Sequence, residues 1–284
     1  MSVNRLLVAG AGQMGAGIVQ VSAVAGLDVV MIDVADEFLA RGMAGIEKGL
    51  GRLVDKGRME ASARDAALAR ITASTDMGAG ADADLFIEAA PESMELKQGL
   101  FEQAAALLRA DAIIASNTSS LSVSALAASV TGPERFVGIH FFNPVPLMAL
   151  VEVVRGDQTS DETLAAARAF AETVGKTAIT VEDSPGFVVN RILFPMINEA
   201  ANAFVDGVAS AGDIDTGMKL GANWPMGPLA LADLVGLDTT KAILETLERE
   251  LGDPKYKPAA VLGELVDAGK LGRKSGAGFY DYGR

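Results

Sequence analysis

The stretch that decides the fold is LLVAGAGQMGAGIVQVSAVAGLDVVMID, residues 6–33. It begins with a short apolar segment, Leu6–Ala9, and continues through a Gly-x-Gly-x-x-Gly motif into a segment with helical periodicity. A second apolar segment, Asp28–Ile32, follows, and Asp33 comes directly after it, 18 residues beyond the third glycine. This order predicts a strand, a tight turn, a helix and a second, parallel strand, which is how a doubly wound α/β sheet begins.

The glycines of the motif have separate physical tasks. Gly10 allows the tight turn, Gly12 lets the backbone approach a pyrophosphate, and Gly15 lets the helix pack on the strand. Phosphates bind at helix N-termini, so we expect Gln13 and Met14, which begin this helix, to contact the ligand. A glycine-rich turn without a ligand is the alternative, but the complete strand-turn-helix-strand-acid context favours a dinucleotide site.

The choice of cofactor depends on the acid. Asp33 can accept hydrogen bonds from the adenosine ribose hydroxyls, and its charge would repel a 2′-phosphate. The next two residues, Val34 and Ala35, offer no arginine that would bind such a phosphate. The sequence therefore predicts NAD rather than NADP.

A second informative stretch surrounds His140, the only histidine of the chain. The apolar run Phe136–Ile139 predicts a buried strand before it, and Asn143–Pro146 predicts a loop after it. His140 would thus lie at the end of a strand, where open α/β sheets bind ligands. Glu152 follows in an apolar setting, and a histidine held by a carboxylate can act as a general base. A core histidine bonded to a carbonyl is the alternative.

Composition excludes several other classes of protein. Half of the 284 residues are apolar, which is enough for a sizeable core, and the net charge of -13 argues against nucleic acid or an anionic membrane as the main partner. The absence of cysteine excludes disulfides and thiolate metal sites, and a single histidine excludes a histidine-rich metal site. No apolar run approaches the roughly 18 residues of a spanning helix. The N-terminus lacks the layout of a signal peptide, so we expect a soluble, cytoplasmic protein without a metal.

The chain changes character near Asp183–Gly186. Before this point strands and helices alternate, which predicts a Rossmann-type doubly wound parallel sheet over residues 1–184. After it the periodicity is helical, which predicts a smaller all-helical domain over residues 185–284. A helix that opens at Pro185 would present Asn190 early, either as a packed amide or as a polar group that reaches a cleft between the domains.

Two polar features remain. Lys48, Arg52 and Lys56 recur at a spacing of four residues, so they share one face of a predicted helix over Glu37–Lys56. This basic face is either a solvated surface or a binding site for an anionic group. Ser116–Ser120 follows a predicted strand, and its hydroxyls and amide are either an ordinary turn or part of a site near the nicotinamide.

Six segments together carry a resemblance to a known family. They are GAGQMG with Asp33, ASNTSSLSV from Ala115, HFFNPVP from His140, PGFVVNRIL from Pro185, NWPMGP from Asn223 and GRKSGAGFYDY from Gly272. In this order they resemble the short-chain 3-hydroxyacyl-CoA dehydrogenases over essentially the whole chain, most of all the bacterial 3-hydroxybutyryl-CoA dehydrogenases. One departure is Trp224, where close relatives often carry histidine.

The resemblance implies roles for individual residues. His140 would be the catalytic base, oriented by Glu152, while Ser119 and Asn190 would hold the substrate. Further cofactor contacts would come from residues in both domains, namely Glu92, Lys97, Asn117, Asn143 and Lys274. Lys56 would contact coenzyme A, with Arg52 as a possible helper.

The implied reaction is the NAD-dependent interconversion of a (3S)-3-hydroxyacyl-CoA and its 3-ketoacyl-CoA. Two alternatives are a dehydrogenase of a free hydroxy acid or sugar acid, similar to lambda-crystallin, and a non-catalytic NAD-binding protein. The resemblance also implies a homodimer formed through the C-terminal domain. Acyl-chain preference, direction and pathway stay open, since fatty-acid oxidation, butyrate formation and polyester metabolism all use such a reaction.

Overall fold

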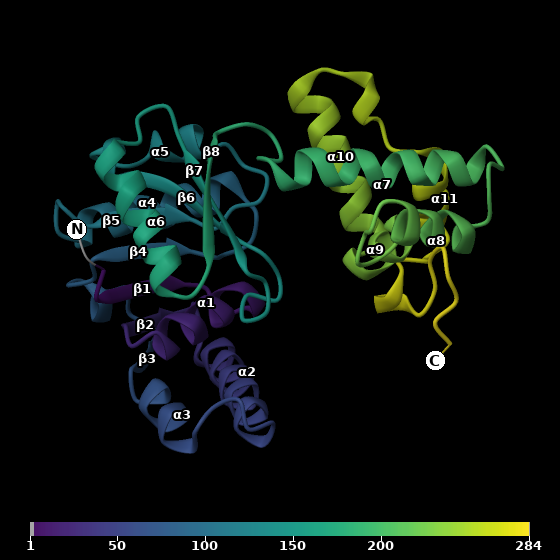
Figure 1. Ribbon diagram of the computed structural model, residues 1–284. Helices are drawn as coiled ribbons and strands as arrows, with labels where there is room; N and C mark the ends of the chain where they lie inside the picture. The colour runs from purple at the N-terminus through teal and green to yellow at the C-terminus, as the bar shows by residue number, and fades with distance from the viewer. Residues whose placement is uncertain (1–2, 284) are drawn as a thin grey trace. The chain divides into compact units, whose positions relative to one another are not determined.

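The computed structural model describes residues 3–283, and the chain divides into two compact units between Ser184 and Pro185 (Figure 1). The first unit combines a sheet with helices, and the second is helical. In the described part of the chain, no helix is both long enough and apolar enough to cross a membrane.

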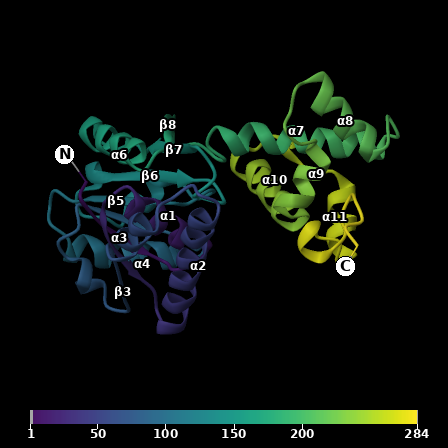
Figure 2. The same cartoon turned by 60° about the horizontal axis from the view of Figure 1, so that its bottom comes forward.

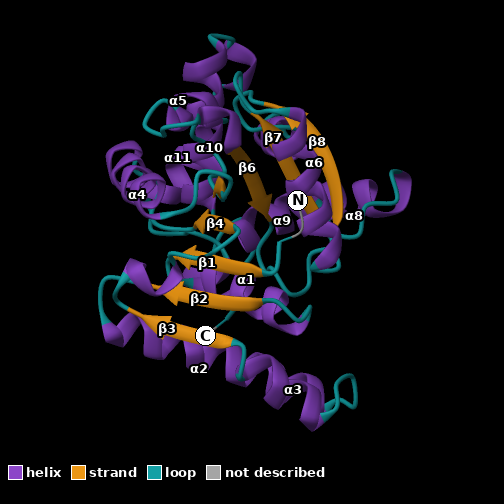
Figure 3. Cartoon of the chain, turned by 90° about the vertical axis from the view of Figure 1, so that its left-hand side faces the viewer, coloured by secondary structure: helices purple, strands orange, loops and turns teal. Residues whose placement is uncertain are grey.

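Within residues 3–184, the first unit is built around an eight-stranded sheet of order β3-β2-β1-β4-β5-β6-β7-β8. The strands are β1 (Arg5–Ala9), β2 (Asp28–Ile32), β3 (Ile71–Ser74), β4 (Leu85–Glu88), β5 (Ile113–Ser116), β6 (Phe136–Phe141), β7 (Leu150–Arg155) and β8 (Thr177–Glu182). The predicted parallel sheet is confirmed for β1 to β6. Figure 3 shows β1, β2 and β3 side by side and running in the same direction.

The sheet reverses direction at one point, because β7 is antiparallel to β6 and β8 is parallel to β7. Only residues 142–149 connect β6 to β7. That is too short for the crossover that parallel neighbours need, which takes a dozen or more residues. β7 and β8 are connected through a helix, so they can run parallel.

Helices cover both faces of the sheet. They are α1 (Gln13–Val24), α2 (Asp36–Asp55), α3 (Ala61–Leu68), α4 (Met94–Leu107), α5 (Val123–Ala127) and α6 (Asp161–Thr173). One core contains Leu6, Val8 and Met31 from the sheet with apolar residues of α1, α2, α3 and α6. On the opposite face Phe101 of α4 packs edge-on against Phe86 and Phe136. Burial on both sides explains why the central strands are continuous apolar runs.

The edge strand β3 was not predicted from the sequence. Its residues Ile71–Ser74 are at least partly exposed, because the strand has a neighbour only on its β2 side. Such a strand lacks the continuous apolar run that marks the central strands.

The second unit contains α7 (Val189–Val205), α8 (Ala211–Gly221), α9 (Pro228–Val235), α10 (Leu237–Leu251) and α11 (Ala260–Asp267) (Figure 2). Its own core includes Phe194, Leu229 and Leu244. The prediction that a helix opens at Pro185 is wrong. Gly186 and Phe187 have φ values of 75° and 49°, in the left-handed region, so the helix begins only at Val189.

Candidate active site

A cavity of about 1150 Å³ lies at the carboxyl ends of β1 and β2 in the first unit. Its wall includes Gly10, Gly12 and Asp33, and it also includes Gln13 and Met14, the first residues of α1. It also includes residues of α2 and the segment that follows β4. The carboxyl ends of strands in an open α/β sheet are where such folds bind ligands.

The glycine-rich turn leaves no room for side chains on its protein-facing side. Gly10 has a φ of 109°, and a Cβ atom there would lie 2.6 Å from the carbonyl oxygen of Ala89. A Cβ atom on Gly15 would lie 1.8 Å from the carbonyl oxygen of Gly10. At Gly12, by contrast, a Cβ atom would meet no described atom within 4 Å. The backbone at Gly12 is therefore open to a ligand that approaches the N-terminus of α1.

Asp33 is held in place at this turn. Its Oδ2 atom accepts a hydrogen bond of 2.7 Å from the backbone N–H of Ala11, and Oδ1 accepts one of 2.7 Å from that of Val34. An ionised carboxylate has about four acceptor positions, so roughly two remain. Two acceptors match the two hydroxyls of an adenosine ribose. The turn, the cavity and this carboxylate together fit the adenosine and pyrophosphate of NAD.

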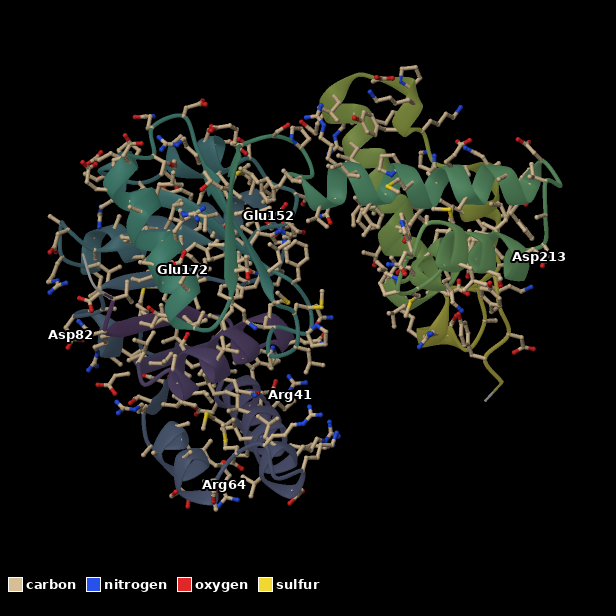
Figure 4. The ribbon with its side chains drawn as sticks, viewed as in Figure 1. Arg41, Arg64, Asp82, Glu152, Glu172 and Asp213 are labelled. Atoms are coloured by element: carbon tan, nitrogen blue, oxygen red, sulfur yellow. The ribbon has the colours of Figure 1, made fainter. Side chains whose placement is uncertain are left out.

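His140 and Glu152 lie in the interior of the same unit. They are directly opposite each other on β6 and β7, and Nδ1 of His140 lies 2.7 Å from Oε2 of Glu152. His140 is 6% exposed and Glu152 is fully buried; Figure 4 labels Glu152 within the sheet. The ring of Phe142 lies against the imidazole, with the ring centroids 4.6 Å apart. Nδ1 is the ring nitrogen that faces the carboxylate, and the role of His140 as a catalytic base stays a prediction.

The loop after β5 is tied to the end of β6 and to Glu92. Oδ1 of Asn117 accepts a hydrogen bond of 2.9 Å from the N–H of Phe141, next to His140. Oε1 of Glu92 accepts hydrogen bonds from the N–H groups of Ser119 and Ser120, at 2.9 and 3.2 Å. These contacts bring the predicted cofactor residues Asn117 and Glu92 and the predicted substrate residue Ser119 together at the carboxyl ends of the strands.

The charge of Glu92 is stabilised by its surroundings. Burial alone would raise the pKa of this carboxyl. The ammonium of Lys97, 3.0 Å from Oε2, and hydrogen bonds from Thr118 and Ser119 outweigh that effect and hold the pKa of Glu92 below its ordinary value. Glu92 is therefore an ionised acceptor at neutral pH.

Lys97 itself is 1% exposed and lies between two carboxylates. Its Nζ is 2.6 Å from Oε1 of Glu88 and also donates to the carbonyl oxygen of Ala90 at 3.2 Å. The other oxygen of Glu88 accepts a hydrogen bond of 2.8 Å from the hydroxyl of Ser116. Glu88 was not predicted as a site residue. A carboxylate at the end of a buried strand could have indicated it, because such strand ends lie where this fold binds ligands. The role of Lys97 as a direct cofactor contact stays a prediction.

Asn143 is exposed at the start of the loop between β6 and β7. This loop is held by Lys176, a residue that was not predicted from the sequence. Nζ of Lys176 donates to the carbonyl oxygens of Val145 and Met148, at 2.6 and 2.8 Å. Burial lowers the pKa of Lys176. The loop is also packed against α1, since a Cβ atom on Gly17 would lie 2.8 Å from Cβ of Val145.

The basic face predicted for residues 37–56 lies on α2. Lys48 and Arg52 are exposed on the helix, and Lys56 is exposed at its C-terminal end. No ion pair joins these three side chains to a carboxylate within residues 3–283. Their charge is available to an anionic ligand, and the assignment to coenzyme A stays a prediction.

Two predicted site residues belong to the second unit. Asn190 lies in the first turn of α7 and is partly buried. Nζ of Lys274 forms an ion pair with Asp238, at 2.6 Å from Oδ1 and 2.7 Å from Oδ2. A catalytic role for Asn190 and a cofactor-binding role for Lys274 both stay predictions. The described residues contain no cluster of histidine, cysteine, aspartate and glutamate that could hold a metal ion.

Comparison with known proteins gives a consistent result for both units. The family model for the 3-hydroxyacyl-CoA dehydrogenase NAD binding domain matches residues 5–184, and that for the 3-hydroxyacyl-CoA dehydrogenase C-terminal domain matches residues 186–282. A probable 3-hydroxybutyryl-CoA dehydrogenase of Deinococcus radiodurans is 53% identical, over 97% of this chain and 99% of the relative. A 3-hydroxybutyryl-CoA dehydrogenase of Bradyrhizobium diazoefficiens is 50% identical, over 99% of this chain and 96% of the relative.

The fold agrees with this result. The crystal structure of (S)-3-hydroxybutyryl-CoA dehydrogenase from Ralstonia eutropha matches with a TM-score of 0.97 and 50% identity, over 100% of both chains. The two matched family models cover nearly all of the sequence, and the first of them is an NAD-binding domain. The chain therefore belongs to the 3-hydroxyacyl-CoA dehydrogenase family and is an NAD-dependent oxidoreductase.

Proposed function

We propose that the protein interconverts (3S)-3-hydroxybutyryl-CoA and acetoacetyl-CoA, with His140 as the base. The observation that carries this proposal is the 2.7 Å contact between Nδ1 of buried His140 and Oε2 of buried Glu152. It occurs in a chain that is about half identical to proteins named for this substrate. A histidine and a carboxylate in this arrangement provide the proton transfer that oxidation of an alcohol requires.

The pair acts through its two ring nitrogens. Glu152 accepts the Nδ1–H hydrogen bond, which fixes the imidazole tautomer and leaves the lone pair on Nε2. Nε2 takes the proton from the 3-hydroxyl group of the substrate, and the carboxylate stabilises the imidazolium that forms. NAD, when bound, supplies the chemistry that accepts a hydride from C3.

Other side chains position the substrate in this proposal. Ser119 is on the loop held by Glu92 and would donate its hydroxyl to the substrate oxygen. Asn190 would provide an amide for the same oxygen or for the thioester. Positioning of this kind lowers the barrier because the reacting atoms no longer need to find their orientation.

The basic face of α2 would bind the coenzyme A part of the substrate. Lys56 and Arg52 would contact the phosphates of coenzyme A, since both are exposed and neither forms an ion pair with a carboxylate among residues 3–283. The reacting end of the substrate has only four carbons and offers little to bind. Binding energy from the remote CoA moiety can position C3 instead.

We also propose a cytoplasmic homodimer that forms through the second unit. This unit exposes apolar side chains, among them Val208 between α7 and α8 at 73% and Leu220 of α8 at 81%. Apolar exposure of this kind marks interaction surfaces when several such side chains adjoin. Light scattering after size-exclusion chromatography would give the mass of twice the 29.3 kDa chain if the proposal is correct.

The decisive experiment is NADH oxidation with three substrates: acetoacetyl-CoA, a longer 3-ketoacyl-CoA and free acetoacetate. We expect rapid turnover of acetoacetyl-CoA and very slow turnover of acetoacetate. Turnover of free keto acids in place of CoA esters would support the hydroxy-acid or sugar-acid alternative. Binding of NADH with no turnover of any of the three substrates would support a non-catalytic NAD-binding protein.

A further inference from the structure

One face of α2 forms a wall of the cofactor cavity. The lining residues on this helix are Phe38, Arg41, Gly42 and Gly45. Their spacing of i, i+3, i+4 and i+7 places them on a single side of the helix. The two glycines add no side chains to this side, so the cavity extends up to the helix backbone.

The position of this wall relative to Asp33 is fixed through Ala11. The N–H of Ala11 donates to Oδ2 of Asp33 at 2.7 Å. The carbonyl oxygen of Ala11 faces α2: a Cβ atom at Gly42 would lie 2.8 Å from it, so α2 packs closely against Ala11. Arg41 is the neighbour of Gly42 in the chain and lines the same cavity as Asp33.

The guanidinium of Arg41 has no carboxylate to neutralise it among the ion pairs of residues 3–283. Its carbon lies 4.7 Å from the centre of the Phe38 ring. Its Nε makes a long hydrogen bond of 3.4 Å to the backbone oxygen of Glu37. Figure 4 shows Arg41 on α2, with other nitrogen-bearing side chains along the same helix. The cavity that holds the carboxylate of Asp33 thus also has a cation in its wall.

We infer that Arg41 is a specificity-determining residue: it can bind a ribose 2′-phosphate, and the carboxylate of Asp33 is what prevents it from doing so. The inference rests on the proposed placement of the adenosine ribose at Asp33. Guanidinium groups bind phosphate through charge-assisted, often bidentate hydrogen bonds. A carboxylate at the same place repels a phosphate and binds ribose hydroxyls instead. The cavity selects NAD by repulsion, although it contains the group that NADP would need.

This changes the reason for the cofactor preference. The two positions directly after the acid, Val34 and Ala35, offer no arginine. In the structure the arginine comes from the second turn of α2, eight positions after Asp33, and reaches the cavity from the side. Removal of one carboxylate is therefore expected to change the preference further than it would in a cavity without this cation.

The test uses Asp33→Ser, Arg41→Leu and the double variant. Serine at position 33 keeps a hydroxyl that can accept the Ala11 N–H but removes the charge. Calorimetric titration with 2′,5′-ADP and with ADP measures binding without any need for catalysis. We expect Asp33→Ser to bind 2′,5′-ADP about tenfold or more tightly than the double variant does, the effect of one charge-assisted contact. The affinities of these two proteins for ADP should differ by less than about threefold, which is well below the effect of one such contact.

A matched control and a salt series complete the test. Arg64→Leu, added to Asp33→Ser, removes a partly exposed arginine of α3 that pairs with Asp65, and it should leave binding of 2′,5′-ADP unchanged. The tighter binding of 2′,5′-ADP that Arg41 provides should shrink at high ionic strength, since an exposed charge is screened. The corresponding NADPH and NADH kinetics with acetoacetyl-CoA should follow the binding data.

Two results would overturn the inference. The first is equal binding of 2′,5′-ADP by Asp33→Ser and by the double variant. The second is a double variant that binds acetoacetyl-CoA more weakly than Asp33→Ser does but binds 2′,5′-ADP equally well, because Arg41 would then belong to the basic face. A failure of the proposed reaction is a separate outcome: acetoacetyl-CoA would not turn over, while the nucleotide titrations would still decide the role of Arg41.

Discussion

His140 and Glu152 form a directly opposed pair on the antiparallel strands β6 and β7, with Nδ1 and Oε2 2.7 Å apart. Both side chains are in the interior, and both are carried by strands rather than by loops. Neighbouring strands hold opposed side chains at a nearly constant distance. The orientation of the imidazole is therefore set by the sheet itself.

The first prediction concerns this pair. His140→Ala should lower kcat for acetoacetyl-CoA reduction by roughly 10²–10⁴-fold, the usual contribution of a positioned acid or base. Glu152→Gln should also lower kcat, since it removes the charge that stabilises the imidazolium. Binding of NADH, followed by its fluorescence, should be unchanged in both variants. Near-normal turnover of His140→Ala with an unaltered pH profile would exclude His140 as the base.

The second prediction concerns the basic face of α2. Lys56→Ala should raise KM for acetoacetyl-CoA far more than KM for NADH, because the lysine would contact the CoA phosphates. The difference from wild type should shrink as salt is added, since an exposed charge pair is screened within about 10 Å at 0.1 M ionic strength. Lys270→Ala, at an exposed position of the second unit, is the control. Unchanged kinetics with acetoacetyl-CoA at all salt concentrations would show that the basic face is only a solvated surface.

The third prediction concerns the buried ion pair of Lys97 and Glu88, with Nζ and Oε1 2.6 Å apart. Lys97→Met would leave a fully buried carboxylate without its cation, which typically costs about 3–5 kcal/mol. Glu88→Gln in the same protein should recover part of that loss. Lys255→Met removes the exposed pair with Asp253 and should cost far less, because solvent screens that pair. Urea denaturation gives all three values, and equal losses from the two lysine variants would contradict the prediction.

The fourth prediction concerns stability in acid. The pKa of Glu92 is lower in the folded protein than its ordinary value of 4.5, chiefly because the opposing effect of burial is outweighed by Lys97 and by hydrogen bonds from Thr118 and Ser119. The unfolded chain then takes up more protons as the pH falls, so this contribution is present above about pH 4.5 and is lost below it. Glu92→Gln should be less stable than wild type at pH 7. The difference in Tm should narrow as the pH falls below 4.5. A constant difference from pH 7 to pH 3 would contradict this account.

The fifth prediction compares two helical glycines. A Cβ atom on Gly17 of α1 would lie 2.8 Å from Cβ of buried Val145, whereas one on Gly99 of α4 would meet no described atom within 4 Å. Gly99→Ala should stabilise by about 0.5–1 kcal/mol through helix propensity alone. Gly17→Ala should destabilise, because overpacking costs about 1–3 kcal/mol and Lys176 holds the loop at Val145. Gly17→Ala should also lower kcat, since the displaced loop carries Asn143, a predicted cofactor contact. Changes of the same sign in the two variants would argue against this packing.

Some features could be predicted because their causes are local in the sequence. The dinucleotide-binding unit is specified within residues 6–33, where apolar periodicity, glycine spacing and one acid each act over a few residues. The change from alternating to helical periodicity near Asp183 is local in the same sense. His140 could be singled out because the chain has no other histidine.

Only the tertiary structure decided which distant side chains meet. The short connection after β6 forces β7 to run antiparallel, and that reversal places Glu152 opposite His140. The packing of α4 brings Lys97 between Glu88 and Glu92, and the packing of α2 brings Arg41 to the cavity of Asp33. Periodicity shows which face of a helix is apolar, but it does not show which strand end its polar residues will reach. Those contacts depend on the order and direction of the strands, which the sequence specifies only through the whole fold.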